Sequence, residues 1–162
     1  MRWWSRMMDR MRSLLRKSVA VIKRPSRGAR RQAEFELARR DFHRHRERLE
    51  AKFFDLASNS GKPRGLRWTE CDFDNDVTYA RQRSTGQLCA FVSVTIGFEA
   101  IEGGAMEGVE AVGNLRAATA VFGLIDGRWH TEGRSLFNLS PSEAIAHYQD
   151  NLEMVQHEPA RS

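Results

Sequence analysis

The longest apolar run of the 162-residue chain is LCAFVSVTIGFEAI, which spans Leu88 to Ile101. Every second residue from Leu88 to Phe98 is apolar, whereas the intervening positions are only partly apolar. A period of two with many β-branched and aromatic residues predicts a strand at the centre of a β-sheet. Because one side is wholly apolar and the other is mixed, we expect an antiparallel sheet with a helix on one face.

Turn signals on both sides of this run predict an antiparallel meander of four or five strands. Asp74–Asp76 and Ser84–Gln87 are expected as turns, and Asp126-Gly127 is the strongest hairpin signal in the sequence. The expected strands are Leu66–Phe73, Val77–Arg83, Leu88–Ile101, Leu115–Ile125 and Arg128–Asn138, with Val109–Val112 as a short additional paired segment.

Helices are expected before and after the meander. Apolar residues three, four or seven apart predict a long helix over Ala29–Ser58. That stripe consists of Phe35, Ala38, Phe42, Leu49, Phe53 and Leu56. Ser140-Pro141-Ser142-Glu143 combines an N-cap, a proline at the first helical position and a capping-box glutamate, which predicts a short C-terminal helix. Its expected apolar positions are Ala144, Ile145, Tyr148 and Leu152.

This order of elements predicts an α+β domain with the long N-terminal helix across one face of the sheet. It resembles, at fold level only, cystatin-like and NTF2-like domains, in which a helix lies across a curved antiparallel sheet. Folds of this kind carry many functions, so the resemblance implies a shape and no activity.

Charge is distributed unevenly along the chain. Residues 1–31 hold eleven Lys and Arg against one acid, a net charge of +10, and residues 32–162 hold fifteen against twenty, a net −5. We therefore divide the sequence into a basic amphipathic arm at 1–31 with a hinge at Pro25–Gly28, one α+β domain at 32–156, and a frayed tail at 157–162.

The arm predicts attachment to an anionic membrane surface, to RNA or the ribosome, or to an acidic protein. Trp3 and Trp4 favour a membrane, whereas the arginine series continuing through Arg46 and Arg48 favours RNA. The basic residues expected to make the contact are Arg2, Arg6, Arg10, Arg12, Arg16, Lys17, Lys23, Arg24, Arg27, Arg30 and Arg31.

The first functional hypothesis is thus a non-catalytic binding or adaptor module tethered by the arm. We expect a cytoplasmic protein, peripheral to a membrane if the arm binds lipid, because no apolar segment has the length of a membrane span. The apolar run Val19–Ile22 is also too short for a secretory signal. An arm rich in Arg and poor in acids matches an organellar transit peptide as well, which is the alternative location.

Two other hypotheses follow from the same sequence. The first is an NTF2-like ligand-binding protein or enzyme, with a pocket in the sheet's concavity lined by Cys89, Phe91, Thr95, Phe122, Trp129 and His130. Ordinary core packing accounts for the same side chains. The second is a structural protein that associates with itself through the long helix or an open sheet edge.

An acidic run before the second strand is the main candidate for metal binding. On a straight strand Glu70, Asp72, Asp74 and Asp76 would point to one side, as the ligands of a hard cation would. The run departs from a calcium loop, because valine and arginine occupy the positions of the required glycine and bidentate glutamate. The sequence therefore predicts an acidic turn and no metal site.

Catalytic signals are weak elsewhere. His130 and Glu132 share one side of a predicted strand, an arrangement that suits an acid and a base but also a surface pair. No histidine and cysteine cluster has zinc spacing, and no nucleophile elbow is present. Cys71 and Cys89 are far apart, which is typical of packed thiols in a reducing compartment. We accordingly predict no catalytic residue and no cofactor.

Overall fold

The computed structural model describes residues 24–161. The chain divides into two compact units, Met1–Glu36 and Leu37–Ser162. Helix α2 (Arg27–Ser58) begins in the first unit and continues into the second, and the sheet belongs wholly to the second. The structure confirms the α+β class: a long N-terminal helix packs on an antiparallel sheet, and a short helix follows near the C-terminus.

Helix α2 begins two residues after Pro25, inside the predicted hinge. The hydroxyl of Ser26 accepts a hydrogen bond of 3.2 Å from the backbone amide of Ala29 and so caps the first turn. Arg27 and Gly28 are therefore helical. The helix thus starts within the segment predicted as a hinge, because Ser26 supplies an acceptor that the free amides of a helix start require.

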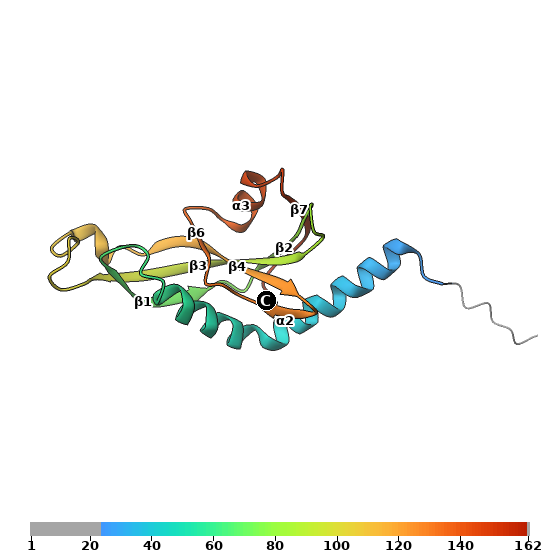
Figure 1. Ribbon diagram of the computed structural model, residues 1–162, viewed down its shortest axis with the longest axis horizontal. Coiled ribbons are helices and arrows are strands. Elements are labelled where there is room, and N and C mark those ends of the chain that lie inside the picture. Colours follow the sequence, from blue (N-terminus) through green and yellow to red (C-terminus); the bar gives the residue numbers. More distant parts are fainter. Residues whose placement is uncertain (1–23, 162) are drawn as a thin grey trace, which may run out of the picture. The chain divides into compact units, whose positions relative to one another are not determined.

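Seven antiparallel strands form one sheet (Figure 1). They are β1 (Leu66–Phe73), β2 (Val77–Gln82), β3 (Leu88–Ala100), β4 (Arg116–Ile125), β5 (Arg128–His130), β6 (Ser135–Phe137) and β7 (Leu152–Glu158). The order is β5-β4-β3-β2-β7, with β1 also paired to β3 and β6 to β4. The connection between β3 and β4 contains a short 3-10 helix, η1 (Glu110–Gly113), where Val109–Val112 was predicted to pair as a strand.

Strand β3 is the centre of the sheet, as its sequence predicts. It pairs with β4 over Cys89–Ile96 along one edge. Its other edge is shared, because β2 pairs with its N-terminal part and β1 with the part from Val94 onward. The 13 residues of β3 therefore hold three strands in register.

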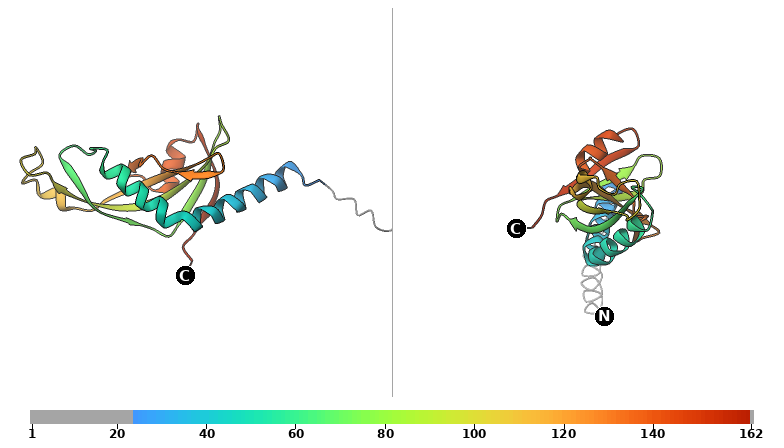
Figure 2. Two further views of the ribbon diagram at one scale, coloured as in Figure 1. Left: turned by 60° about the horizontal axis from the view of Figure 1, so that its bottom comes forward. Right: turned by 90° about the vertical axis from the view of Figure 1, so that its left-hand side faces the viewer.

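Helices cover both faces of the sheet (Figures 1 and 2). From Leu37 onward α2 lies on one face, and α3 (Pro141–His147) lies on the other. The ring of Phe42 lies 5.0 Å from that of Trp129 and 5.5 Å from that of Phe122 in edge-to-face contacts. Both faces of β3 are consequently covered and largely buried, where the sequence predicted only one covered face.

The predicted apolar stripe of α2 is confirmed except at its C-terminal end. Ala38, Phe42, Leu49 and Phe53 are buried. Leu56 is 38% exposed, whereas Ala57 is only 1% exposed. In the last turn Ala57, and not Leu56, therefore faces the sheet. A small side chain is needed at this position because the backbone of Gly133 lies close to the helix there.

The predicted fifth strand is interrupted. Asp126 and Gly127 adopt positive φ angles of 49° and 72° and form the predicted hairpin between β4 and β5. The chain leaves the sheet after His130 and returns at Ser135, with Gly133 at φ 72° between the two strands. A left-handed residue cannot continue an extended strand, so β5 and β6 pair separately with β4.

The C-terminal segment differs most from the prediction. The capping box is confirmed: Ser140 accepts from the Glu143 amide, and the Glu143 carboxylate accepts from the Ser140 amide. Helix α3, however, ends at His147, and Leu152 starts β7, which pairs with the edge strand β2. The frayed tail expected from His157 is wrong for His157 and Glu158, which lie in β7. The strand forms because the edge of β2 has unpaired backbone amide and carbonyl groups. Only the folded chain brings Leu152–Glu158 next to that edge.

Two glycines with the same φ angle allow a test of the contact between α2 and the β5–β6 segment. A Cβ atom at Gly133 would lie 2.7 Å from the backbone nitrogen of Ala57, whereas one at Gly127 would have no neighbour within 4 Å. Gly127→Ala is expected to lower the free energy of unfolding by about 1 kcal/mol through backbone strain alone. Gly133→Ala is expected to cost about 1–3 kcal/mol more, because the helix must move. Equal losses in urea denaturation would contradict the close packing.

Candidate functional site

The arginines of α2 fall into two groups according to their contacts. Arg39 forms an ion pair of 2.9 Å with Glu158 of β7. Arg46 forms one of 2.6 Å with Glu50 and donates hydrogen bonds to the carbonyl groups of Asp74 and Asn75 in the β1–β2 turn. These two guanidinium groups are therefore engaged within the fold and hold neighbouring segments against the helix.

Four other cations of α2 form an exposed series that we call the cationic row. Its members are Arg40, Arg44, Arg48 and Lys52. Among the described residues they make no ion pair or hydrogen bond. Because successive members are four residues apart in sequence, the row advances by about 6 Å per step along one ridge of the helix. Arg40 and Arg44 lie opposite the buried stripe of α2, and the ridge turns toward the β4–β5 hairpin at Arg48 and Lys52.

Acids near the cationic row neutralise little of its charge. The carboxylate of Asp41 lies 3.2 Å from Nδ1 of His45, and that of Glu50 is paired with Arg46. Glu47 and Asp55 are exposed and lie three residues after Arg44 and Lys52, so both acids weaken the local positive potential. The row together with these two acids still carries a net charge of +2.

A groove of about 460 Å³ extends the cationic row onto the sheet. It lies between α2 and the β4–β5 hairpin, and Arg48, Lys52 and Arg128 line it against the single acid Asp41. The indole nitrogen of Trp129 donates a 2.9 Å hydrogen bond to the carbonyl of Ala38, which holds the hairpin on the helix. Three cations from two elements therefore converge on one groove.

A second basic hollow, of about 550 Å³, lies on the other side of α2. Arg40 and Arg161 line it together with the group that surrounds Glu158. Burial raises the pKa of the Glu158 carboxyl. The hydrogen bond from His43 and the charges of His43 and Arg39 outweigh burial and hold that pKa below its usual range. Glu158 thus anchors the end of β7 to α2.

The structure describes only part of the predicted anion-binding arm. Arg24, Arg27, Arg30 and Arg31 are all exposed. The other predicted contacts lie outside the described residues: Arg2, Arg6, Arg10, Arg12, Arg16, Lys17 and Lys23. Sequence reasoning missed the cationic row, although its four-residue spacing was visible. The sequence does not distinguish Arg44 and Arg48 from Arg39 and Arg46. Only the latter two contact residues that lie far along the chain, Glu158 and Asn75.

The residues predicted to line one pocket are divided between the two faces of the sheet. Cys89 and Phe91 belong to a cluster on the α3 side. Phe122 and Trp129 contact Phe42 on the α2 side. The register explains the division, because Phe122 lies opposite Ala90, and Ala90 alternates with its neighbours in β3. His130 lies exposed on β5 and Thr95 half-buried on β3, so the six residues do not share one cavity.

The acidic run does not gather into a metal site. Strand β1 ends at Phe73, so Asp74 and Asp76 lie beyond the strand that would have aligned them with Glu70 and Asp72. Asp76 accepts a hydrogen bond from the amide of Ala160. Within residues 24–161, no three His, Cys, Asp or Glu side chains are arranged to hold a metal ion.

Neither cysteine is an activated nucleophile. Burial, with Glu50 and Asp72 nearby, raises the pKa of Cys71 to about 12. Burial also raises the pKa of Cys89. Both thiols are therefore protonated at neutral pH. His130 and Glu132 line one small hollow, but no hydrogen bond joins them in the described structure.

Comparison with known proteins adds no family. No protein-family model, no curated protein and no solved structure matches the chain significantly. None of the helices in the described part of the chain is both long and apolar enough to cross a bilayer. The function is therefore argued from the side chains described above.

The Glu158 cluster predicts a specific pH dependence of stability. Glu158→Gln is expected to lower the free energy of unfolding by about 1–2 kcal/mol at pH 7, since hydrogen bonds to charged groups contribute on that order. Folding lowers the pKa of the Glu158 carboxyl. The ionised carboxylate therefore stabilises the folded state fully at any pH above the unfolded-state pKa of about 4.3. This contribution is lost as the pH falls through the lower pKa of the folded state. The difference between wild type and variant in urea denaturation should therefore shrink below about pH 4.

Glu153→Gln is the matched control for this experiment. Glu153 lies on the same strand, but its carboxylate is exposed. Its nearest cation, Arg83, is 3.9 Å away, so the ion pair is weak. Its replacement is expected to change stability by less than about 0.5 kcal/mol at any pH. A loss for Glu158→Gln that stays constant from pH 3 to pH 8 would refute the assignment.

Proposed function

We propose that the protein is a non-catalytic module that binds RNA through the cationic row of α2. The observation that carries this proposal is a series of four exposed cations that form no ion pair with an acid of the described chain. The basic residues of 1–31 would add to the same electrostatic attraction. RNA binding is compatible with the cytoplasmic location that the sequence predicts.

The chemistry of the row suits phosphate groups. Guanidinium presents a planar set of donors that matches phosphate oxygens, and phosphate contacts account for most of the affinity of proteins for nucleic acids. The adjoining groove supplies Arg128, and His45 and His130 also line it. Several phosphates of one strand could thus lie along the helix, with one seated in the groove.

The packing of α2 supports RNA over a membrane surface. An amphipathic helix that binds lipid buries its own apolar face in the bilayer. In the second unit that face is already occupied, because Phe42 and Phe53 are fully buried against the sheet. The exposed large apolar residues of this part of α2 are Leu37 and Leu56, and they lie at its two ends.

The proposal is tested with the full chain and a fluorescently labelled single-stranded RNA of about 20 nucleotides. Arg44→Gln with Arg48→Gln is expected to weaken binding about tenfold in anisotropy titrations near 0.1 M salt. The slope of log K against log salt should fall in magnitude by about 1.4, because each phosphate contact with a single strand contributes about 0.7.

Lys62→Gln with Arg64→Gln removes the same charge from the loop before β1 and serves as the control. Both side chains are exposed and make no contact with an acid of the described chain. Glu47→Gln provides the reciprocal test and is expected to tighten binding two- to threefold. Equal weakening by both double variants, or flotation with anionic vesicles and no RNA binding, would overturn the proposal.

A further inference from the structure

The face of the sheet opposite α2 is incompletely covered. Helix α3 has only seven residues and buries Ala144 and Ile145 against the sheet. Beside it remains a hollow of about 380 Å³, which we call the Phe91 hollow. Its volume falls in the range of pockets that bind small molecules. The strands β2, β3, β4 and β6 and the turn before β7 all contribute to its lining.

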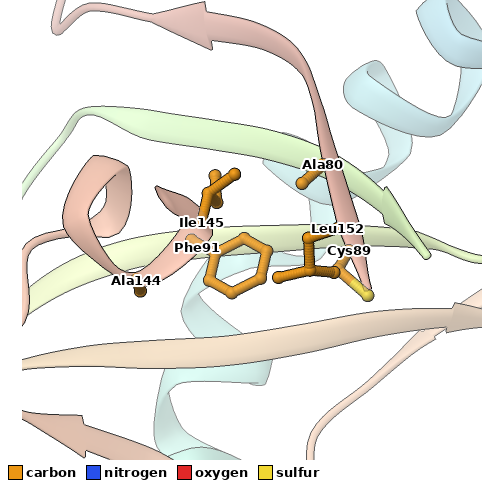
Figure 3. Close-up of a cluster of buried hydrophobic side chains, with 6 residues drawn as sticks. All are labelled: Ala80, Cys89, Phe91, Ala144, Ile145 and Leu152. Carbon is orange, nitrogen blue, oxygen red and sulfur yellow. The ribbon is translucent and has the colours of Figure 1, made fainter. Parts of the chain in front are cut away.

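The floor of the Phe91 hollow is apolar and uncharged. Phe91 and Leu152 lie side by side at its base, with Cys89 next to them (Figure 3). The half-buried side chains of Val121 and Leu136 continue this surface along β4 and β6. The Cys89 thiol is protonated, so no charge interrupts the floor. Such a surface suits an aliphatic chain or a small ring.

Arg134 is the single charged residue that lines the Phe91 hollow within the described chain. Its guanidinium is exposed and forms no ion pair or hydrogen bond with a described residue. The other polar groups of the rim, on Gln82, Ser84, Asn151 and Tyr148, are neutral. The rim therefore places one cation, without an ion-pair partner among the described residues, beside an apolar floor.

A smaller hollow of about 230 Å³ continues on the other side of Arg134. It shares Gln82, Cys89, Val121 and Arg134 with the first, and Glu132 also lines it. That carboxylate repels an anion from the smaller hollow. The favoured arrangement therefore places an anionic head at Arg134 and its apolar tail over Phe91.

We propose that the Phe91 hollow binds a small amphipathic carboxylate, with the carboxylate on Arg134 and the apolar tail on Phe91 and Leu152. This site is separate from the cationic row, which lies on the opposite side of the sheet. A bidentate carboxylate–guanidinium contact fixes the head, and burial of the tail supplies most of the affinity.

The test uses three probes of similar tail and different head: octanoate, octanol and octylamine. In amide chemical-shift titrations of the full chain, octanoate is expected to move the signals of Phe91, Val121, Leu136 and Leu152. Octanol should bind the same residues about tenfold more weakly, and octylamine should not bind there. Octanoate shifts confined to other residues would overturn the proposal.

Variants separate the head from the tail. Arg134→Gln is expected to reduce octanoate affinity to that of octanol and to leave octanol binding and RNA binding unchanged. Arg64→Gln removes an exposed arginine elsewhere and should change none of these values. Val121→Trp fills the hollow and should abolish both ligands while the spectrum stays dispersed. A preference for octanoate over octanol that survives Arg134→Gln would refute the role of that residue.

Discussion

The packing of Phe42 into the rings of Tyr79, Phe122 and Trp129 is the contact on which the rest of the structure depends. It fixes the rotation of α2 about its own axis. Since successive residues of a helix differ by about 100°, Phe42 facing the sheet places Arg44 and Arg48 toward solvent. A rotation by one residue would bury a charge and expose an aromatic ring, which costs several kcal/mol. The positions of the surface charges thus follow from the core.

The same helix uses one residue type for two purposes. Arg39 and Arg46 reach acids or carbonyl groups of other elements and hold β7 and the β1–β2 turn in place. Arg44 and Arg48 have no such partner among the described residues and keep their charge available. Whether an arginine of α2 has a structural role or remains able to bind a polyanion therefore depends on whether the fold places an acid or a carbonyl group within its reach.

The two faces of β3 carry different chemistry because two helices of unequal length cover them. The long helix α2 fills its face with aromatic rings and leaves charges outside. The short helix α3 covers only part of the other face and leaves the Phe91 hollow beside it. The proposed polyanion surface and the proposed carboxylate site therefore lie on opposite sides of one sheet.

Local patterns in the sequence determined the central strand, the Asp126-Gly127 hairpin, the capping box at Ser140 and most of the helix stripe, because each depends on neighbours within a few residues. The fold decided what depends on distant partners. The edge of β2 converted Leu152–Glu158 into a strand, and the close approach of Ala57 accompanies the interruption at Gly133. The pairing register of β3 and β4 places Phe91 and Phe122 on opposite faces of the sheet. The position of Glu158 allows an ion pair with Arg39. Contacts between segments that are far apart in the chain leave no periodic signal in the sequence, so only the tertiary structure assigns them.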